Sequence, residues 1–134
     1  MKKDIIPQIV EDIAVAVVTE ENDLGEKEWN VYLLNLKKEK IEGVLVTSKG
    51  YGSLDGEEVK TSTLRHFLDE VKAQSFVKIE PIVETVFGLN NEFWVSFYIN
   101  KIMYDKKYIF LAESITPTNL ITIPLINKKG VMIK

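Results

Sequence analysis

The sequence predicts a mainly β protein, built as an antiparallel β-sandwich. Short runs rich in Val, Ile, Phe and Tyr alternate apolar and polar residues with a period of two, which is typical of half-buried strands. Turn-forming residues separate these runs roughly every 8–12 residues, the spacing found in sandwiches and small barrels. The alternating strand and helix patterns of a doubly wound parallel sheet are absent from the sequence.

Length and composition fit one globular domain over residues 1–134. Single cores usually contain about 100–200 residues, and 46% hydrophobic with 28% charged residues is ordinary globular usage. We expect an immunoglobulin-like arrangement of the two sheets. This expectation concerns architecture alone, because the chain has no cysteine for the disulfide framework of antibody domains. A small OB-like β-barrel is the alternative.

Three strands are predicted in the first part of the chain. The first covers 13–18, an unbroken run of Ile, Ala and Val, after which polar residues around Gly25 turn the chain. The second covers 28–36 and mixes Trp, Tyr, Val and Leu. The third covers 41–48, where β-branched side chains favour a strand.

Three further strands are predicted at 75–83, 93–99 and 102–111. Pro81 cannot donate a hydrogen bond to a neighbouring strand, so the first of these is expected to lie at a sheet edge or to end there. The other two flank Asn100-Lys101, which is expected to form a two-residue hairpin loop because Asn tolerates a positive φ.

The segment 120–133 is expected to add one or two short strands. It is strongly apolar, and an uncovered apolar edge would adhere to other chains. The segment must therefore dock on its own sheet or on a second copy of the chain. Docking on its own sheet is expected, and a homodimer through this segment is the alternative.

One segment departs from the strand pattern. Four apolar residues there follow the helical spacing i, i+3, i+4 and i+7, namely Leu64, Phe67, Leu68 and Val71. The spacing predicts a short helix over about 61–71, and a strand is the alternative.

The stretch 47–58 contains three of the seven glycines: Gly50, Gly52 and Gly56. Their spacing is one residue longer than the dinucleotide-binding fingerprint, and two glutamates follow where a phosphate loop would have a lysine. We therefore expect turn chemistry. Residues 49–52 are expected to leave the preceding strand, and Asp55-Gly56 is a strong turn dipeptide.

Arg65 and His66 are the only arginine and the only histidine in the chain. A histidine can act as a general base near neutral pH, and an arginine can clamp a carboxylate. Neighbouring residues project in different directions, however, so the two are not expected to converge on one substrate atom. The alternative function is a small enzyme or ligand-binding protein, with a site made of Lys49, Gly50, Gly52, Arg65 and His66.

No catalytic residue, cofactor or metal is assigned. The sequence has no cysteine and one histidine, and it contains neither a calcium-loop pattern nor the serine nucleophile motif G-x-S-x-G.

An aromatic surface is the preferred candidate for binding. The odd-numbered residues of 93–99 are apolar and are expected to fill the core, which leaves Trp94 and Tyr98 on the opposite face. Tyr104 and Tyr108 share a parity on the next predicted strand. This face either serves as structural cover within the protein or contacts a partner. Because Trp and Tyr suit partner contacts, these four residues are the candidates for binding an unidentified protein or small ligand.

The preferred function is therefore a non-catalytic interaction or ligand-binding module. Single-stranded nucleic acid also stacks on aromatic rings, but the net charge of −3 disfavours it. No apolar run approaches the ~20 residues of a membrane span, and Asp4 and Pro7 interrupt what would be a secretory core. A cytoplasmic protein that does not associate with membranes is expected.

Overall fold

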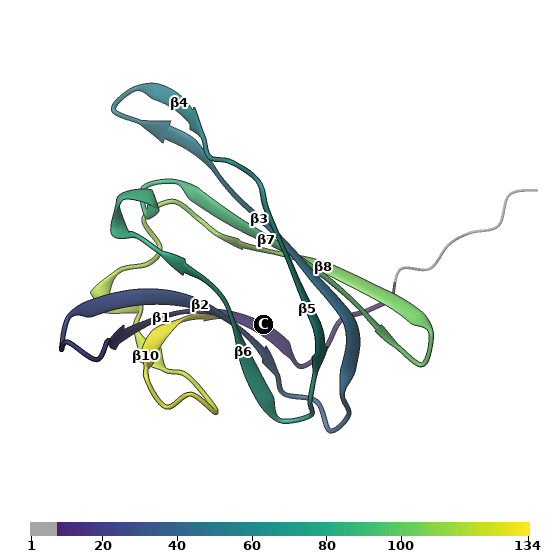
Figure 1. The fold of residues 1–134 in the computed structure, drawn as a ribbon. Helices are drawn as coiled ribbons and strands as arrows, with labels where there is room; N and C mark the ends of the chain where they lie inside the picture. Colours follow the sequence, from purple (N-terminus) through teal and green to yellow (C-terminus); the bar gives the residue numbers. More distant parts are fainter. Residues whose placement is uncertain (1–7) are drawn as a thin grey trace, which may run out of the picture.

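Two antiparallel sheets pack face to face (Figure 1). The computed structural model describes residues 8–134, so Asp4 and Pro7 lie outside the described residues. Sheet A has the strand order β6-β2-β1-β10-β9, and sheet B has the order β4-β3-β7-β8, with β5 also paired to β3. The predicted antiparallel sandwich is confirmed, and within residues 8–134 the strands form these two separate sheets instead of a closed barrel.

The strands of sheet A are β1 (Ile13–Glu21), β2 (Lys27–Asn35), β6 (Ser75–Ile82), β9 (Ile121–Thr122) and β10 (Lys129–Ile133). Those of sheet B are β3 (Ile41–Leu54), β4 (Glu57–Lys60), β5 (Leu64–Val71), β7 (Asn90–Ile99) and β8 (Ile102–Phe110). Two short 3-10 helices, η1 (Glu84–Val86) and η2 (Pro117–Asn119), lie in the connections.

The core fills the space between the sheets. Alternate residues of β1, such as Val15 and Val17, face alternate residues of β7, such as Phe93 and Phe97, and all four are buried in one cluster. Burying a side chain of this size contributes about 1.5–3 kcal/mol relative to leaving it in water. The alternation predicted for 93–99 is thus confirmed.

The part of the outer face of sheet A that lies along β1 is covered by the chain's own carboxyl-terminal segment. Ala14 and Ala16 point away from the main core and pack with Ile123 in a second buried cluster. The approach is close, since a Cβ placed on Gly130 would lie 2.5 Å from the carbonyl oxygen of Val17. This second layer explains why 13–18 is apolar at every position. It also confirms docking on the chain's own sheet, because β10 lies between β1 and β9.

A polar cluster holds the covering segment in place. Glu20 accepts hydrogen bonds from Lys128 Nζ (2.7 Å), Tyr32 Oη (2.6 Å) and Asn30 Nδ2 (2.7 Å). Burial opposes ionisation of Glu20, but these hydrogen bonds outweigh it and lower the pKa of the carboxyl. The same burial, together with the Glu20 charge, raises the pKa of Tyr32.

The helix predicted over 61–71 is wrong, because β5 occupies most of that segment and pairs with β3. The helical spacing arose from two strand features. Phe67 is apolar yet lies on the solvent side, where alternation would place a polar residue. A bulge near Leu68 then shifts the alternation, so that Val71 is buried.

The glycine stretch is mostly strand. β3 continues through Gly50 and Gly52 to Leu54, so the expectation that 49–52 leaves the strand is wrong. The turn at Asp55-Gly56 is confirmed, with φ of 52° and 81°. The chain then returns as β4, a short edge strand that the sequence analysis did not predict. β4 contains a single apolar residue, Val59, so it shows no alternation.

The chain crosses between the sheets from β5 to β6, and this crossing positions the cavity described below. Residues 72–74 make the tight connection, and β5 and β6 then diverge as edge strands of different sheets (Figure 1). The edge position expected from Pro81 is confirmed. The hairpin loop at Asn100-Lys101 is confirmed too, with φ of 49° and 66°.

Among residues 8–134, no helix has the length and apolarity needed to cross a membrane.

Candidate functional site

The outer face of sheet B carries an exposed apolar surface, which we call the aromatic face. Trp94 and Tyr98 project from β7 and are 44% and 43% exposed. Leu45 of β3 is also exposed, and its cross-strand partner Phe67 of β5 is 69% exposed. Met103 of β8 is the partner of Tyr98. The aromatic face is therefore defined as Leu45, Phe67, Trp94, Tyr98 and Met103.

Contacts within the protein orient two of these rings. The indole Nε1 of Trp94 donates a hydrogen bond to Asp105 (2.9 Å), and Lys107 Nζ lies 4.8 Å from the centroid of the ring. Tyr98 lies against Gly43, where a Cβ would be 3.1 Å from the Tyr98 ring. Because these contacts already favour one orientation of each ring, binding a partner would cost less entropy than ordering free side chains.

Tyr104 and Tyr108 do not belong to this surface. Tyr108 is fully buried, and its hydroxyl donates to the carbonyl of Ile13 (2.7 Å); the burial raises its pKa. Tyr104 stacks on Phe97 at 5.3 Å between ring centroids, on the inner side of the sheet. The structure thus divides the four predicted binding residues between the two faces.

The hairpin register explains this division and could have been read from the sequence. A two-residue loop at Asn100-Lys101 pairs Ile99 with Ile102, and counting outward then pairs Phe97 with Tyr104 and Phe93 with Tyr108. Cross-strand partners share a face. Tyr104 and Tyr108 therefore follow the inward residues of β7.

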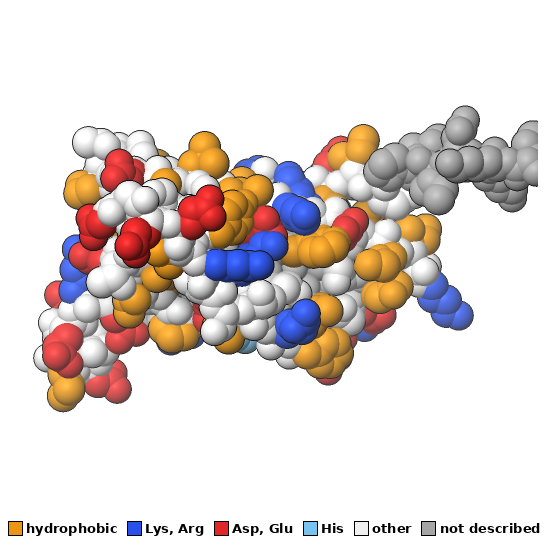
Figure 2. Space-filling model, turned by 90° about the horizontal axis from the view of Figure 1, so that it is seen from above, with side chains coloured by type: hydrophobic (Ala, Val, Ile, Leu, Met, Phe, Trp, Pro, Cys, Tyr) orange, Lys and Arg blue, Asp and Glu red, His pale blue; other side chains and the backbone are white. Residues whose placement is uncertain are grey.

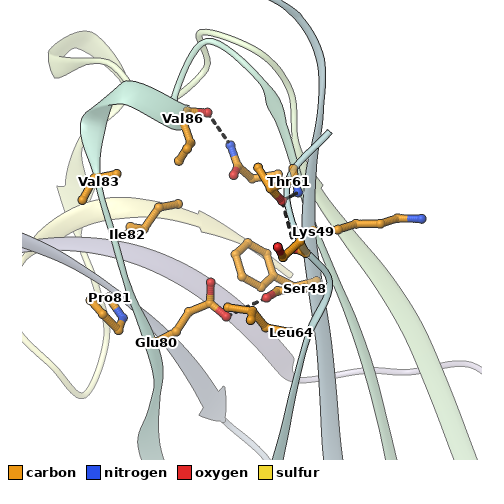
Figure 3. Close-up of a pocket in the computed structure, with 13 residues that line it drawn as sticks. Ser48, Lys49, Thr61, Leu64, Glu80, Pro81, Ile82, Val83 and Val86 are labelled. Carbon is orange, nitrogen blue, oxygen red and sulfur yellow. Dashed lines mark hydrogen bonds between the residues drawn. The ribbon is translucent and has the colours of Figure 1, made fainter. Parts of the chain in front are cut away.

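A separate cavity of about 270 Å³ lies where β5 and β6 diverge (Figure 3). Both sheets contribute to its walls. The lining residues used below come from β3 (Ser48, Lys49, Gly50), β5 (Leu64), β6 (Glu80, Ile82), the position after β6 (Val83), η1 (Val86) and β7 (Asn91, Phe93).

Glu80 is the charged group at the centre of this site. Its Oε1 accepts a hydrogen bond from Ser48 Oγ (2.6 Å) and another from His66 Nε2 (2.7 Å). The Glu80 side chain is only 14% exposed. Since Ser48 and His66 belong to sheet B and Glu80 to sheet A, this network connects the two sheets beside the cavity.

The alternative ligand site is assembled only in part. Lys49 and Gly50 line the cavity, and His66 reaches it through Glu80. The Lys49 ammonium, however, points away from the cavity (Figure 3) and lies 3.8 Å from Glu92. Arg65 projects outward beside Thr47, so it and His66 face opposite sides of β5, as expected. Gly52 lies further along β3, next to β4.

Sequence reasoning missed Ser48 and Glu80. Regular alternation within the predicted strand 75–83 would place Glu80 on the polar side, together with Lys78 and opposite Val77 and Ile79. A bulge opposite Val31 and Tyr32 shifts the register of β6, so that Glu80 pairs with the inward-facing Val31. Nothing in the local sequence indicates that bulge.

Within residues 8–134, no group of three or more His, Asp or Glu side chains is arranged to hold a metal ion. Fold and surfaces together define a two-sheet β protein with an exposed aromatic face and a separate small cavity. No protein-family model, curated protein or solved structure matches the chain.

Proposed function

We propose that the chain is a non-catalytic interaction module that binds a protein partner through the aromatic face. The observation that carries this proposal is the exposure of five large apolar side chains on four adjacent strands. Figure 2 views sheet B from outside and shows hydrophobic side chains interleaved with lysine and arginine across the middle of this face. Exposed apolar side chains that gather on one face among polar residues commonly mark interaction sites.

The residue types favour a protein partner over nucleic acid. Trp, Tyr and Arg are the commonest hot-spot residues of protein interfaces, and Arg65 lies in the same cross-strand row as Trp94. Charges of both signs surround the rings, since Lys107 and Asp105 both contact Trp94. A nucleic-acid surface would instead be consistently basic, and the chain carries a net charge of −3.

The arrangement at the cavity also supports a binding role over acyl-transfer chemistry. A serine nucleophile is activated by a base that accepts its proton, usually a histidine nitrogen. Ser48 instead donates to the Glu80 carboxylate, and His66 donates to the same oxygen. The Ser48 hydroxyl and the His66 imidazole therefore both hold Glu80 and do not pair with each other.

Affinity capture with matched variants tests the proposal. We expect the unmodified chain to recover a specific partner, and the Trp94→Ala/Tyr98→Ala variant to lose it. The Leu24→Ala/Leu111→Ala variant is the control, because it removes exposed apolar side chains that lie outside the aromatic face. With the purified partner, titration calorimetry should show affinity at least about 30-fold weaker, as expected for hot-spot residues worth about 2 kcal/mol or more.

Urea unfolding should show that the Trp94→Ala/Tyr98→Ala variant remains folded under the capture conditions. Equal recovery by this variant and the control would remove the aromatic face as the binding surface. Loss of self-association in the variant, seen by sedimentation, would identify a second copy of the chain as the partner.

A further inference from the structure

We infer that the cavity between β5 and β6 is a binding site for a small amphipathic molecule with a primary ammonium group. This site is separate from the aromatic face, because its lining residues are inward-facing or lie at the edge between the sheets. The inference does not depend on the proposed protein contact.

The walls of the cavity suit an apolar body. Leu64 and Val83 lie at its exposed edge, while Ile82 and Phe93 are buried behind them. Val86 of η1 adds a further aliphatic side chain. Ligand sites in proteins are usually lined mainly by such side chains, with a few polar groups that fix orientation.

The carboxylate of Glu80 favours a ligand that donates hydrogen bonds. Ser48 and His66 both donate to Oε1 of Glu80, and Figure 3 shows the second carboxylate oxygen turned up, away from the Ser48 bond. A carboxylate only accepts hydrogen bonds. A bound ammonium would donate to this oxygen and would also neutralise the charge that the apolar walls surround.

A second hydrogen-bond acceptor lines the same cavity. Asn91 is buried, and its Nδ2 donates to the carbonyls of Val86 and Leu89 (3.0 and 3.1 Å). Its Oδ1 therefore faces the other way and lies 3.5 Å from the position of a Cβ on Gly50, another lining residue. Two acceptors and one negative charge disfavour an anionic ligand.

The dimensions limit the ligand to a small one. The volume of the cavity is about 270 Å³, just below the range of roughly 300–1,000 Å³ that is usual for ligand pockets. A short aliphatic amine fits this description, whereas a nucleotide or a large cofactor does not.

Three probes with the same six-carbon chain isolate the contribution of the charge: hexylamine, hexanol and hexanoate. Binding is measured by NMR titration of the full chain at neutral pH, with chemical-shift changes expected at Leu64, Ile82 and Phe93. We expect hexylamine to bind at least tenfold more tightly than hexanol, and hexanoate to bind most weakly.

Two variants and one control complete the test. Glu80→Gln should weaken hexylamine at least tenfold and leave hexanol unchanged, whereas Glu21→Gln, which removes an exposed carboxylate elsewhere, should change neither. If Glu80→Gln fails to fold, Leu64→Trp is used to fill the edge of the cavity and should abolish hexylamine binding. The inference is overturned if no probe binds, if hexylamine and hexanol bind equally, or if neither cavity variant weakens hexylamine.

Discussion

Tyr108 connects the two sheets through a single hydroxyl. The residue belongs to β8 in sheet B, and its hydroxyl donates to the carbonyl of Ile13 in β1 of sheet A. The ring is fully buried, so no water replaces this bond if it is lost.

Replacing Tyr108 by Phe should lower the free energy of unfolding by about 1–2 kcal/mol, because the buried carbonyl of Ile13 loses its side-chain donor. The variant should also change the response to alkali. Burial raises the pKa of Tyr108 in the folded state, so its contribution to stability is present below the unfolded pKa of about 10 and is lost as the pH rises above it.

Urea unfolding at about pH 7 and about pH 11 measures both effects. The loss of stability between these pH values should be smaller in Tyr108→Phe than in the unmodified chain. Tyr98→Phe, on the exposed aromatic face, is the control and should leave stability at neutral pH unchanged. If Tyr108→Phe and the unmodified chain lost the same unfolding free energy at alkaline pH, the burial of Tyr108 would not be the cause of the loss.

For individual side chains, the sequence predicts the correct face of the sheet where alternation is regular. Trp94 and Tyr98 were expected on the face opposite the core, and they lie there. Tyr108 lies on the other face because the hairpin loop pairs it with the inward-facing Phe93, and parity along its own strand does not show this. Glu80 was misplaced for a different reason, since its direction depends on a bulge against β2 that the local pattern does not contain.

The hairpin of β7 and β8 is set by two residues with positive φ. Asn100 and Lys101 have φ of 49° and 66°, as a type I′ turn requires. A lysine in this conformation brings its Cβ close to the backbone, at a cost of about 1–2 kcal/mol. Asn-Gly is the pair that this turn prefers.

Lys101→Gly should therefore stabilise the protein by about 0.5–1 kcal/mol, after the greater entropy of glycine in the unfolded chain offsets part of the gain. Urea unfolding should show a higher midpoint with an unchanged slope. Gly56→Ala is the opposite control, because Gly56 has φ of 81° and an alanine there should destabilise. A lower midpoint for Lys101→Gly would mean that the Lys101 side chain stabilises the folded protein by more than its backbone conformation costs.

Most strands could be predicted from their apolar alternation, but β4 and β5 could not. β4 is short and polar because it lies at an edge. β5 combines an exposed Phe67 with a bulge, and together these imitate a helical period. Both errors occurred where pairing with β3, and not the local sequence, determines the conformation.

The two sheets share one hydrophobic core. The main cluster of buried side chains includes residues of β1 and β2 from sheet A and of β3 and β7 from sheet B. Neither sheet can separate without exposing this cluster. Because both sheets contribute to this cluster, we expect the protein to unfold in one cooperative step.

The two tryptophans test this cooperativity, because Trp29 lies in β2 of sheet A and Trp94 in β7 of sheet B. In the single-tryptophan variants Trp29→Phe and Trp94→Phe, urea unfolding followed by fluorescence should coincide with unfolding followed by far-ultraviolet circular dichroism. An earlier fluorescence transition in either variant would mean that the sheet containing the remaining tryptophan opens on its own.

The sandwich as a class could be predicted from alternation and turn spacing, whereas the order of the strands could not. β1 pairs with β10, and β3 pairs with β7. These partners are far apart in the sequence, and their pairing is decided by which faces fit together in the core.

The bond from Tyr108 to Ile13 joins groups 95 positions apart. Contacts between residues so far apart in the sequence give the chain a high relative contact order. Each such contact forms only after a long loop has closed, and loop closure costs conformational entropy. We expect refolding on the scale of milliseconds to seconds, far slower than helical bundles of similar length. Unpaired strands are exposed until folding is complete, and exposed strands aggregate at high protein concentration. We therefore expect the highest yield of native protein when refolding is carried out at low protein concentration.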